Sequence, residues 1–341
     1  MLAMVSIGLP MRLSLAFGAA FAAATLALPA TAQPARAEQP RTADGHPDLQ
    51  GLWYAASITG LQRNKKIQGL VIPPDKADET IKTLTRPGPD GVYDPDNDYF
   101  NPDQLLSVRG ELRSSWLTEP ADGRLPYTRL ATSTLERIDA LETFGFDNPE
   151  ERPAWERCVS SLGHPPIMAN SYVIPHQIVQ TPDAIVIATE DTDGARIIHL
   201  AGPQPPQVLR SRGGYSAGRW DGDTLIVETT HVSAPDPTGV VYRGPIPLTE
   251  ASRTIERFTL LAPSEILYRF TVEDPALFTA PWSAEYVLRR HPDKFHEYAC
   301  HEGNYAIVNA LTAARLGRQS DKAADDKRQA KEEKKAANAA E

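Results

Sequence analysis

Residues 215–230 read YSAGRWDGDTLIVETT, and this stretch decides the fold class. Two β-prone runs, 215–220 and 224–230, flank Asp221-Gly222-Asp223. Asp-Gly between two such runs is a strong local signal for a β-hairpin, because glycine adopts the positive φ that tight hairpin turns need. The stretch therefore predicts two antiparallel strands joined by a short turn.

Other short β-prone runs, separated by turn residues, lie on both sides of this hairpin. In the run 265–272, the even positions from Ile266 to Val272 are aliphatic or aromatic, while Leu267, Arg269 and Thr271 lie between them. Such alternation predicts a strand with one buried face. The other predicted strands lie at 48–54, 178–180, 184–189, 196–200, 253–260, 283–290 and 295–300.

The predicted strands follow one another closely, which indicates that neighbours in sequence pair with each other. About ten such strands favour a mostly β fold, either an antiparallel up-and-down β-barrel of the calycin-like kind or a β-sandwich. Apolar residues at helical spacing predict a few peripheral helices, at 75–83, 133–144 and 305–316.

The segment 1–32 has the three parts of a secretory signal peptide. Arg12 gives the positive start, the run 13–28 is apolar, and Ala30-Thr31-Ala32 has the small residues of a cleavage site. The run is shorter than the roughly twenty apolar residues that a transmembrane helix needs. We therefore expect a periplasmic or secreted protein with no membrane span.

Composition divides the rest of the chain into three parts. The polar, proline-containing segment 33–47 predicts an extended arm, and 48–319 predicts a single β-rich domain. The segment 320–341 consists mostly of Ala, Lys, Asp and Glu and has almost nothing to bury, so it predicts a disordered charged tail.

The charge balance bears on the partners of the protein. Asp and Glu number 44 against 35 Lys and Arg, which gives a formal net charge of -9. A negative chain is repelled by phosphate backbones, so we expect no nucleic-acid partner. Composition leaves the oligomeric state open.

The chain has two cysteines, Cys158 and Cys300. In an oxidising compartment an even pair predicts one disulfide, and the alternative is two buried free thiols that pack as small apolar groups. The predicted bond joins segments that are far apart in sequence.

Several motifs resemble a large, poorly characterised family of exported bacterial proteins. The resemblance rests on residues 48–53 (DLQGLW), 178–182 (IVQTP), 218–227 (GRWDGDTLIV), 272–275 (VEDP) and 297–300 (EYAC), and it spans about residues 46–305. It implies an exported protein and the extent of the domain, and no particular activity. The chain departs from the family at Tyr215, where members often have His, and at His231-Val232.

Residues 51–54 (GLWY) are also similar to the Gly-x-Trp start of lipocalin-type barrels, in which the Trp closes one end of the barrel. The resemblance implies a calycin-like barrel with Trp53 at a ligand cavity. The alternative is that Trp53 is an ordinary aromatic residue of the core.

His231 is the first candidate for acid-base chemistry. It follows a predicted strand and opens a proline-rich loop, and the pKa of a histidine near neutrality suits a general base at the mouth of a cavity. Tyr215 and the carboxylate of Glu302 are its candidate partners in proton transfer. The alternative for His231 is a structural hydrogen bond in a loop.

Tyr215, Arg219 and Asp221 are spaced by even numbers along one predicted strand, so their side chains project from the same face. Arg219 can hold an anionic group with its planar fork, and Tyr215 can donate a hydrogen bond. The three residues are therefore candidates for ligand binding. The alternative is that Arg219 and Asp221 form only an ion pair near a turn.

We expect no metal and no cofactor. His296 and His301 are five residues apart, whereas the zincin motif needs four on a helix, and on a strand five places them on opposite faces. The sequence also lacks a P-loop, a Rossmann fingerprint and a Gly-x-Ser-x-Gly elbow.

These observations predict an exported β protein that binds a small apolar or aromatic molecule. It could act on that molecule as a cofactor-independent acid-base enzyme, namely a lyase, an isomerase or a hydrolase. The alternative is a periplasmic binding or envelope protein without turnover, because the same fold can serve either.

Overall fold

The structure is a computed structural model that describes residues 39–55, 57–85, 105–144, 148–152, 156–159, 163–169, 174–191, 195–234, 241–243 and 246–338. The predicted signal peptide and the first residues of the predicted arm lie outside these ranges. We describe the unit from Gln39 onward by itself.

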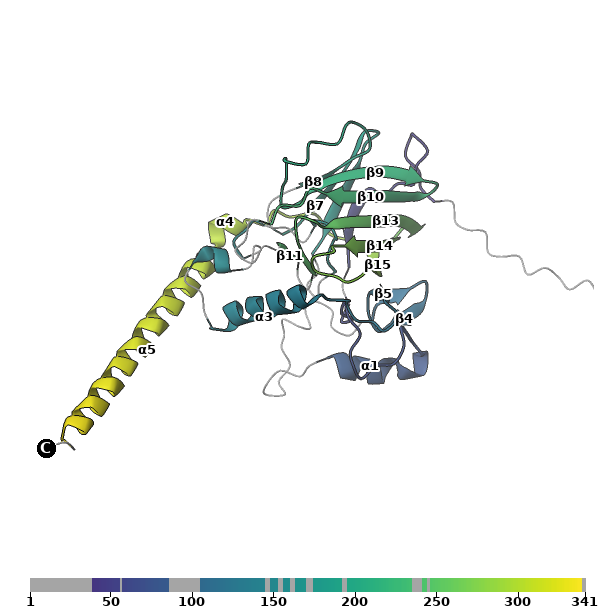
Figure 1. The fold of residues 1–341 in the computed structure, drawn as a ribbon. Helices are drawn as coiled ribbons and strands as arrows, with labels where there is room; N and C mark the ends of the chain where they lie inside the picture. Colours follow the sequence, from purple (N-terminus) through teal and green to yellow (C-terminus); the bar gives the residue numbers. More distant parts are fainter. Residues whose placement is uncertain are drawn as a thin grey trace, which may run out of the picture. The chain divides into compact units, whose positions relative to one another are not determined.

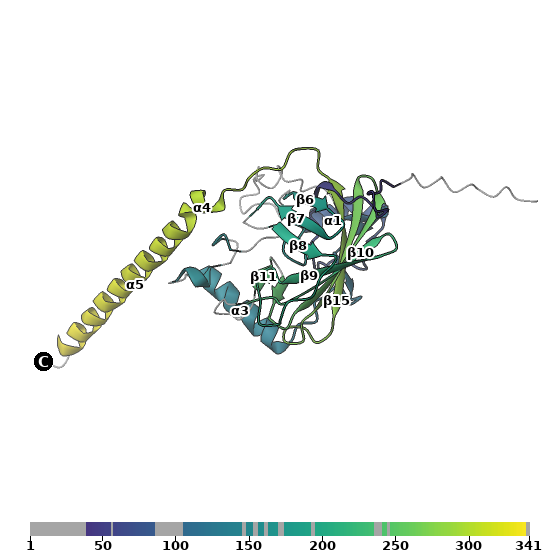
Figure 2. The ribbon, with the colours of Figure 1, turned by 90° about the horizontal axis from the view of Figure 1, so that it is seen from above.

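The fold is mostly β and is built on a closed barrel (Figure 1 and, turned by 90°, Figure 2). In the described chain, ten strands form one sheet in the order β1-β6-β7-β8-β9-β10-β13-β14-β15-β5, and β1 also pairs with β15. That last pairing closes the ring, while β5 adds to β15 outside it. The strands are β1 (Gly51–Tyr54), β6 (His176–Gln180), β7 (Ala184–Thr189), β8 (Ala195–His199), β9 (Tyr215–Asp221), β10 (Thr224–Thr230), β13 (Arg253–Ala262), β14 (Glu265–Glu273), β15 (Trp282–Arg290) and β5 (Leu117–Glu119).

The barrel is mixed, which corrects the expectation of a purely antiparallel one. β8 and β9 run parallel and pair through two positions, Ile198 with Ser216 and His199 with Ala217. Parallel neighbours need a long connection, because the chain must return to the end from which it started. Residues 200–214 supply that connection.

The hairpins and the meander are confirmed. β9 and β10 pair from Tyr215↔Thr230 to Asp221↔Thr224, with Gly222 at φ 56 in the turn. β13 pairs with β14, and β6, β7 and β8 form the antiparallel meander. Local turn chemistry thus determines these pairings.

The predicted strand at 295–300 is wrong. These residues form no strand, and Tyr298 is 58% exposed. β15 already pairs with β14 along one edge and with β1 and β5 along the other, so the closed ring offers no free edge to a further strand. The chain instead leaves the barrel and begins α4 (Cys300–Gly303).

The helices lie near the predicted ranges, and the last is much longer. α5 (Tyr305–Asn338) continues through the segment predicted to be a disordered tail. That segment is rich in Ala, Lys and Glu, which all have high helix propensity. The remaining elements are β2 (Val71–Ile72), β3 (Ser107–Val108), β4 (Glu111–Arg113), β11 (Val241–Arg243), β12 (Ile246–Leu248), η1 (Pro74–Lys76), α1 (Ala77–Leu84), α3 (Arg129–Phe144) and η2 (Pro149–Glu151).

A buried ion pair shows which residues face the interior of the barrel. Arg196 on β8 contacts Glu256 on β13, although β9 and β10 separate these strands. Side chains on strands that are separated by two other strands can reach each other only across the concave side of a closed sheet. Ser216 and Thr229, which bond the same guanidinium, therefore also point inward.

Part of the interior is occupied by the chain itself. In residues 163–169 (the inner segment), the backbone N–H of Ile167 donates to the Tyr268 hydroxyl at 2.9 Å, and the Tyr286 hydroxyl donates to its carbonyl at 2.7 Å. Ile167 is fully buried, and Met168 and Ala169 are buried beside it. The backbone N–H and C=O of Ile167 are thus both satisfied by inward-facing tyrosines.

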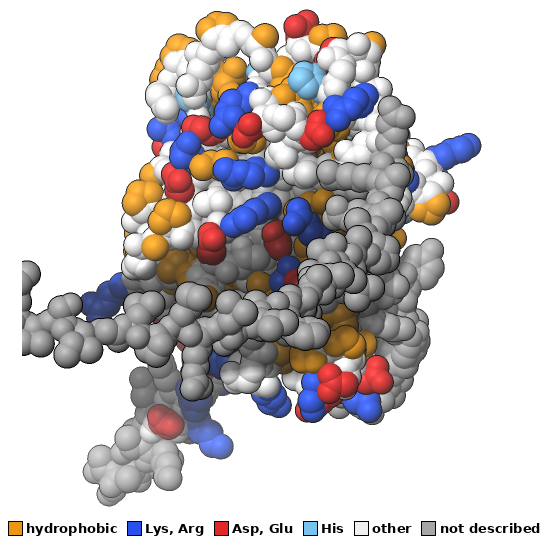
Figure 3. All heavy atoms as spheres, turned by 90° about the vertical axis from the view of Figure 1, so that its right-hand side faces the viewer, with side chains coloured by type: hydrophobic (Ala, Val, Ile, Leu, Met, Phe, Trp, Pro, Cys, Tyr) orange, Lys and Arg blue, Asp and Glu red, His pale blue; other side chains and the backbone are white. Residues whose placement is uncertain are grey.

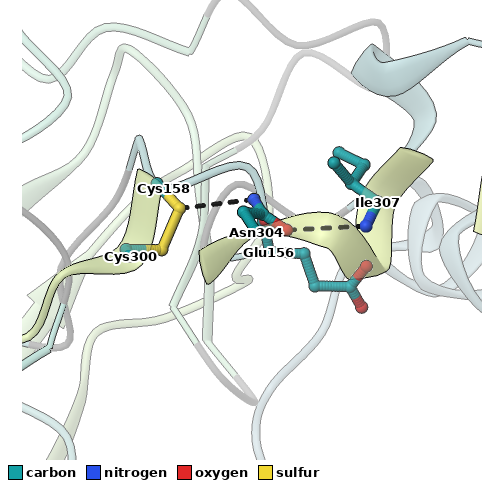
Figure 4. Close-up of a disulfide and its surroundings, with 5 residues drawn as sticks. All are labelled: Glu156, Cys158, Cys300, Asn304 and Ile307. Atoms are coloured by element: carbon teal, nitrogen blue, oxygen red, sulfur yellow. Dashed lines mark hydrogen bonds between the residues drawn. A yellow bond between two sulfur atoms is a disulfide. The ribbon is translucent and has the colours of Figure 1, made fainter. Parts of the chain in front are cut away.

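The predicted disulfide is confirmed between Cys158 and Cys300 (Figure 4). Next to it, the Asn304 side chain donates to the Glu156 carbonyl at 2.7 Å. The bond attaches the start of α4 to residues 156–159, which precede the inner segment.

Candidate functional site

A groove lies on the outer wall of the barrel, where β8 and β9 separate. It has a volume of about 480 Å³, and the outward-facing side chains of β9, β10 and β13 form its floor. We call it the outer groove. It is lined by His199, Leu200, Ala201, Gly202, Gln204, Tyr215, Ala217, Gly218, Arg219, Ile226, Glu228, Thr230, Arg253, Ile255 and Arg257.

The short parallel pairing of β8 with β9 explains the position of the groove. After His199 the chain leaves the sheet, and residues 200–204 form one wall. Gly218 faces the barrel interior, as Ser216 does two residues earlier, and a Cβ there would lie 2.6 Å from Ile198 Cγ2 and 2.9 Å from Leu200 Cδ2. A larger residue at position 218 would clash with these side chains.

Three arginines and one glutamate give the lining an excess of positive charge. Arg253 is engaged, since it donates to Glu228 at 2.7 Å and to Glu273 at 3.0 Å. The hydrogen bond from Arg253 holds the pKa of the Glu228 carboxyl below its usual value, so this carboxylate stays ionised. Glu228 in turn raises the pKa of Arg253.

Arg219 and Arg257 differ from Arg253. Among the described residues, neither makes an ion pair within 4 Å or a side-chain hydrogen bond, although Arg219 lies near enough to Glu228 to help lower the pKa of its carboxyl. On the face of the molecule drawn in Figure 3, basic and acidic side chains are interspersed. Two arginines in one groove are therefore available to a ligand.

Aromatic rings form one end of the groove. The rings of His199 and Tyr215 stack with centroids 4.9 Å apart, and the Tyr215 hydroxyl donates to the Pro203 carbonyl at 3.4 Å. The ring of His231 meets Tyr215 edge-on at 6.1 Å. Two residues that the sequence proposes for proton transfer, Tyr215 and His231, thus lie next to each other.

His231 does not line the groove. Its side chain is buried, with Nδ1 2.7 Å from Thr230 Oγ1 and Nε2 3.2 Å from the Pro205 carbonyl oxygen. A carbonyl only accepts, so Nε2 donates and Nδ1 accepts from the Thr230 hydroxyl. Both nitrogens are engaged, and these contacts fit the structural alternative for His231 better than the general base.

The other predicted site residues are not brought together. Tyr215 and Arg219 line the groove, whereas Asp221 lies at the far end of β9 outside the lining. Glu302 is exposed on α4, and within the described chain no contact joins it to the groove.

Trp53 belongs to the core. It is fully buried, and its indole N–H donates to the Leu49 carbonyl at 2.8 Å. The Arg290 guanidinium lies 4.2 Å from the ring centroid, and it also donates to the Gln50 carbonyl. Gly51, at φ 126, leaves room for this arginine, since a Cβ would lie 1.7 Å from its Nη1. These contacts fit the alternative of a core aromatic.

Sequence reasoning missed Arg257 as a site residue. Arg257 faces outward on β13, which the alternation of that strand indicates. That Arg257 lies next to β10 could not be predicted from the sequence, because residues 231–252 separate β10 from β13. Arg253 was missed for the same reason, and His199 was missed because residues 200–214 separate β8 from β9.

Comparisons with known proteins give no relatives: the chain matches none of the protein-family models, the curated proteins or the solved structures. The class is therefore defined by the fold alone, as a mixed β-barrel with a groove on its wall. In the part of the chain that is described, no helix is long and apolar enough to cross a membrane. No cluster of three His, Cys, Asp or Glu in that part could hold a metal ion.

Proposed function

We propose that the protein is an exported small-molecule-binding protein whose ligand occupies the outer groove. The volume of about 480 Å³ is that of a site for a small organic molecule, for which 300–1,000 Å³ is typical. The signal-like segment 1–32 and the disulfide support export.

The observation that carries the proposal is that Arg219 and Arg257 lie on the floor of a concave site and that neither makes an ion pair within 4 Å with a described residue. The inner segment supports the location, because it occupies space in the barrel interior that a lipocalin-type ligand would need.

Binding without turnover is favoured over acid-base catalysis. A general base must lie within hydrogen-bond reach of its substrate, and both nitrogens of the buried His231 are already engaged. Catalysis by a lyase, isomerase or hydrolase mechanism would require another group of the groove to act as base.

The test is to block the groove sterically. Ala217→Trp places an indole on the groove floor, and Ile197→Trp, at an outward position of β8 outside the lining, is the matched control. Ligands are identified by thermal shift against a library of small organic acids, amides, sugars and aromatic compounds, and affinities are then measured by calorimetry.

We expect Ala217→Trp to abolish binding and Ile197→Trp to preserve it. Equal binding by both variants would overturn the outer groove as the site. Recovery of a chemically altered ligand from the wild-type protein would show that the protein is an enzyme and not only a binding protein.

A further inference from the structure

We infer that the ligand of the outer groove is an organic anion, whose anionic group is held between Arg219 and Arg257 and whose apolar part lies on Ile226 and Ile255. This inference rests on the proposed function and adds the chemical class of the ligand.

The strand register brings the two arginines to one place. Arg219 on β9 is paired with Ile226 on β10, and Ile226 is paired with Arg257 on β13. All three face outward in one row across the sheet, with the arginines two strand spacings, about 10 Å, apart at Cα. Two side chains of this length, on either side of one isoleucine, can converge on a single anionic group.

The surrounding charges favour an anion at this end of the groove. Glu228, the one acidic residue of the lining, is bonded to Arg253, which also bonds Glu273. On the other side, Arg257 lies directly opposite Arg269 on β14, and Arg269 contacts Glu119 at 3.3 Å. Like charges directly opposite destabilise a sheet, and an anion bound to Arg257 would relieve that repulsion.

The chemistry of the arginine side chain indicates the anionic group. A guanidinium presents paired N–H donors in a planar fork, which matches the oxygens of a carboxylate or a phosphate. Ile255 and Ala217 add apolar surface beside the arginines, and Ile226, which is 8% exposed, lies between them on the groove floor. The lining therefore suits an amphiphilic anion better than a fully hydrated inorganic one.

Four probes test the inference by titration calorimetry: octanoate, its neutral analogue octanamide, octyl phosphate and inorganic phosphate. The proteins are the wild type, Arg219→Gln, Arg257→Gln, and the control Arg289→Gln, which removes an outward arginine of β15 outside the groove. Thermal unfolding of each variant verifies that it is folded, and Arg219→Lys retains the charge without the fork.

We expect octanoate or octyl phosphate to bind the wild type, and each groove variant to lose at least tenfold in affinity. Arg289→Gln should bind as the wild type does, and added salt should weaken binding. The stronger of the two anions identifies the headgroup. Arg219→Lys should fall between the wild type and Arg219→Gln.

Three results would overturn the inference. Octanamide could bind as tightly as octanoate, inorganic phosphate could bind as tightly as octyl phosphate, or no anion could bind at millimolar concentration. A ligand whose binding is lost in Ala217→Trp but kept in the arginine variants would support the groove as the site and refute only the inference that the ligand is an anion. Binding that is unaffected by Ala217→Trp would refute the proposed function itself, because the ligand would then not occupy the outer groove.

Discussion

At the scale of single residues, His176 is a buried titratable group. It lies on β6 beside Trp53 of β1, and its Nδ1 is 2.9 Å from Thr189 Oγ1. Burial lowers the pKa of His176 from its usual 6.5 to about 4. The imidazole is therefore neutral in the folded protein at neutral pH, and the Thr189 hydroxyl is its hydrogen-bond partner.

His176 makes the stability depend on pH. Because its pKa is lower in the folded than in the unfolded state, its contribution is complete above pH 6.5 and is lost as the pH falls from 6.5 to about 4. Between pH 7 and pH 5 this loss amounts to about 2 kcal/mol. Urea unfolding at both pH values should give a smaller pH effect for His176→Gln than for the wild type. His291→Gln, at a solvent-accessible position, is the control, and equal pH effects in all three proteins would contradict the assignment.

At the scale of elements, the Arg196 and Glu256 network connects β8 with β13 through the barrel interior. Arg196 Nη1 donates to Glu256 Oε1 at 2.9 Å, and the Tyr268 hydroxyl donates to the same oxygen at 2.7 Å. Burial and the nearby Glu256 raise the pKa of Tyr268 well above its usual value, so the phenol stays protonated. The network therefore holds the hydroxyl that accepts from the inner segment.

Breaking the network should be costly. Arg196→Met leaves the fully buried carboxylate of Glu256 without its counter-ion, and such changes cost about 3–5 kcal/mol. The double variant with Glu256→Gln should recover part of this loss, since no charge then remains buried. Arg269→Met, which removes a partly exposed ion pair, should cost about 1 kcal/mol or less. Chemical unfolding of the four proteins measures these differences, and similar losses for Arg196→Met and Arg269→Met would refute a role for burial.

The arrangement of the strands also determined how much of the outer groove could be predicted from the sequence. Tyr215 and Arg219 share an outward face of one strand, and the even spacing within that strand was sufficient to pair them. Arg257 joins them only because β10 pairs with β13, although residues 231–252 separate these strands in sequence. Alternation along a strand indicates which side chains face outward, but the order of the strands in the sheet decides which of these side chains lie next to each other.

At the scale of the whole molecule, the disulfide connects residues that are 142 apart in sequence. It joins α4, which follows the last barrel strand, to the segment just before the inner segment. Closing so long a loop restricts the unfolded chain, which is one source of stabilisation by disulfides.

Removal of the disulfide should lower the free energy of unfolding by about 2–5 kcal/mol. The measurement compares urea unfolding of the oxidised protein with that of the Cys158→Ser, Cys300→Ser double variant. A reductant should lower the stability of the oxidised protein and leave the double variant unchanged, which separates the disulfide from effects of the serines. Coinciding unfolding curves for the two proteins would show that the bond adds no stability.

The sequence by itself predicted the strands of the closed ring, the two hairpins and the disulfide, and it also predicted a strand at 295–300 that does not form. Alternation and Asp-Gly turns act over a few residues, and two cysteines leave one possible intramolecular bond. Only the tertiary structure decided the parallel pairing of β8 with β9, the inner segment and the row of Arg219, Ile226 and Arg257. These depend on closure of the ring, because the free energy of a strand's lateral position comes from neighbours that are distant in sequence.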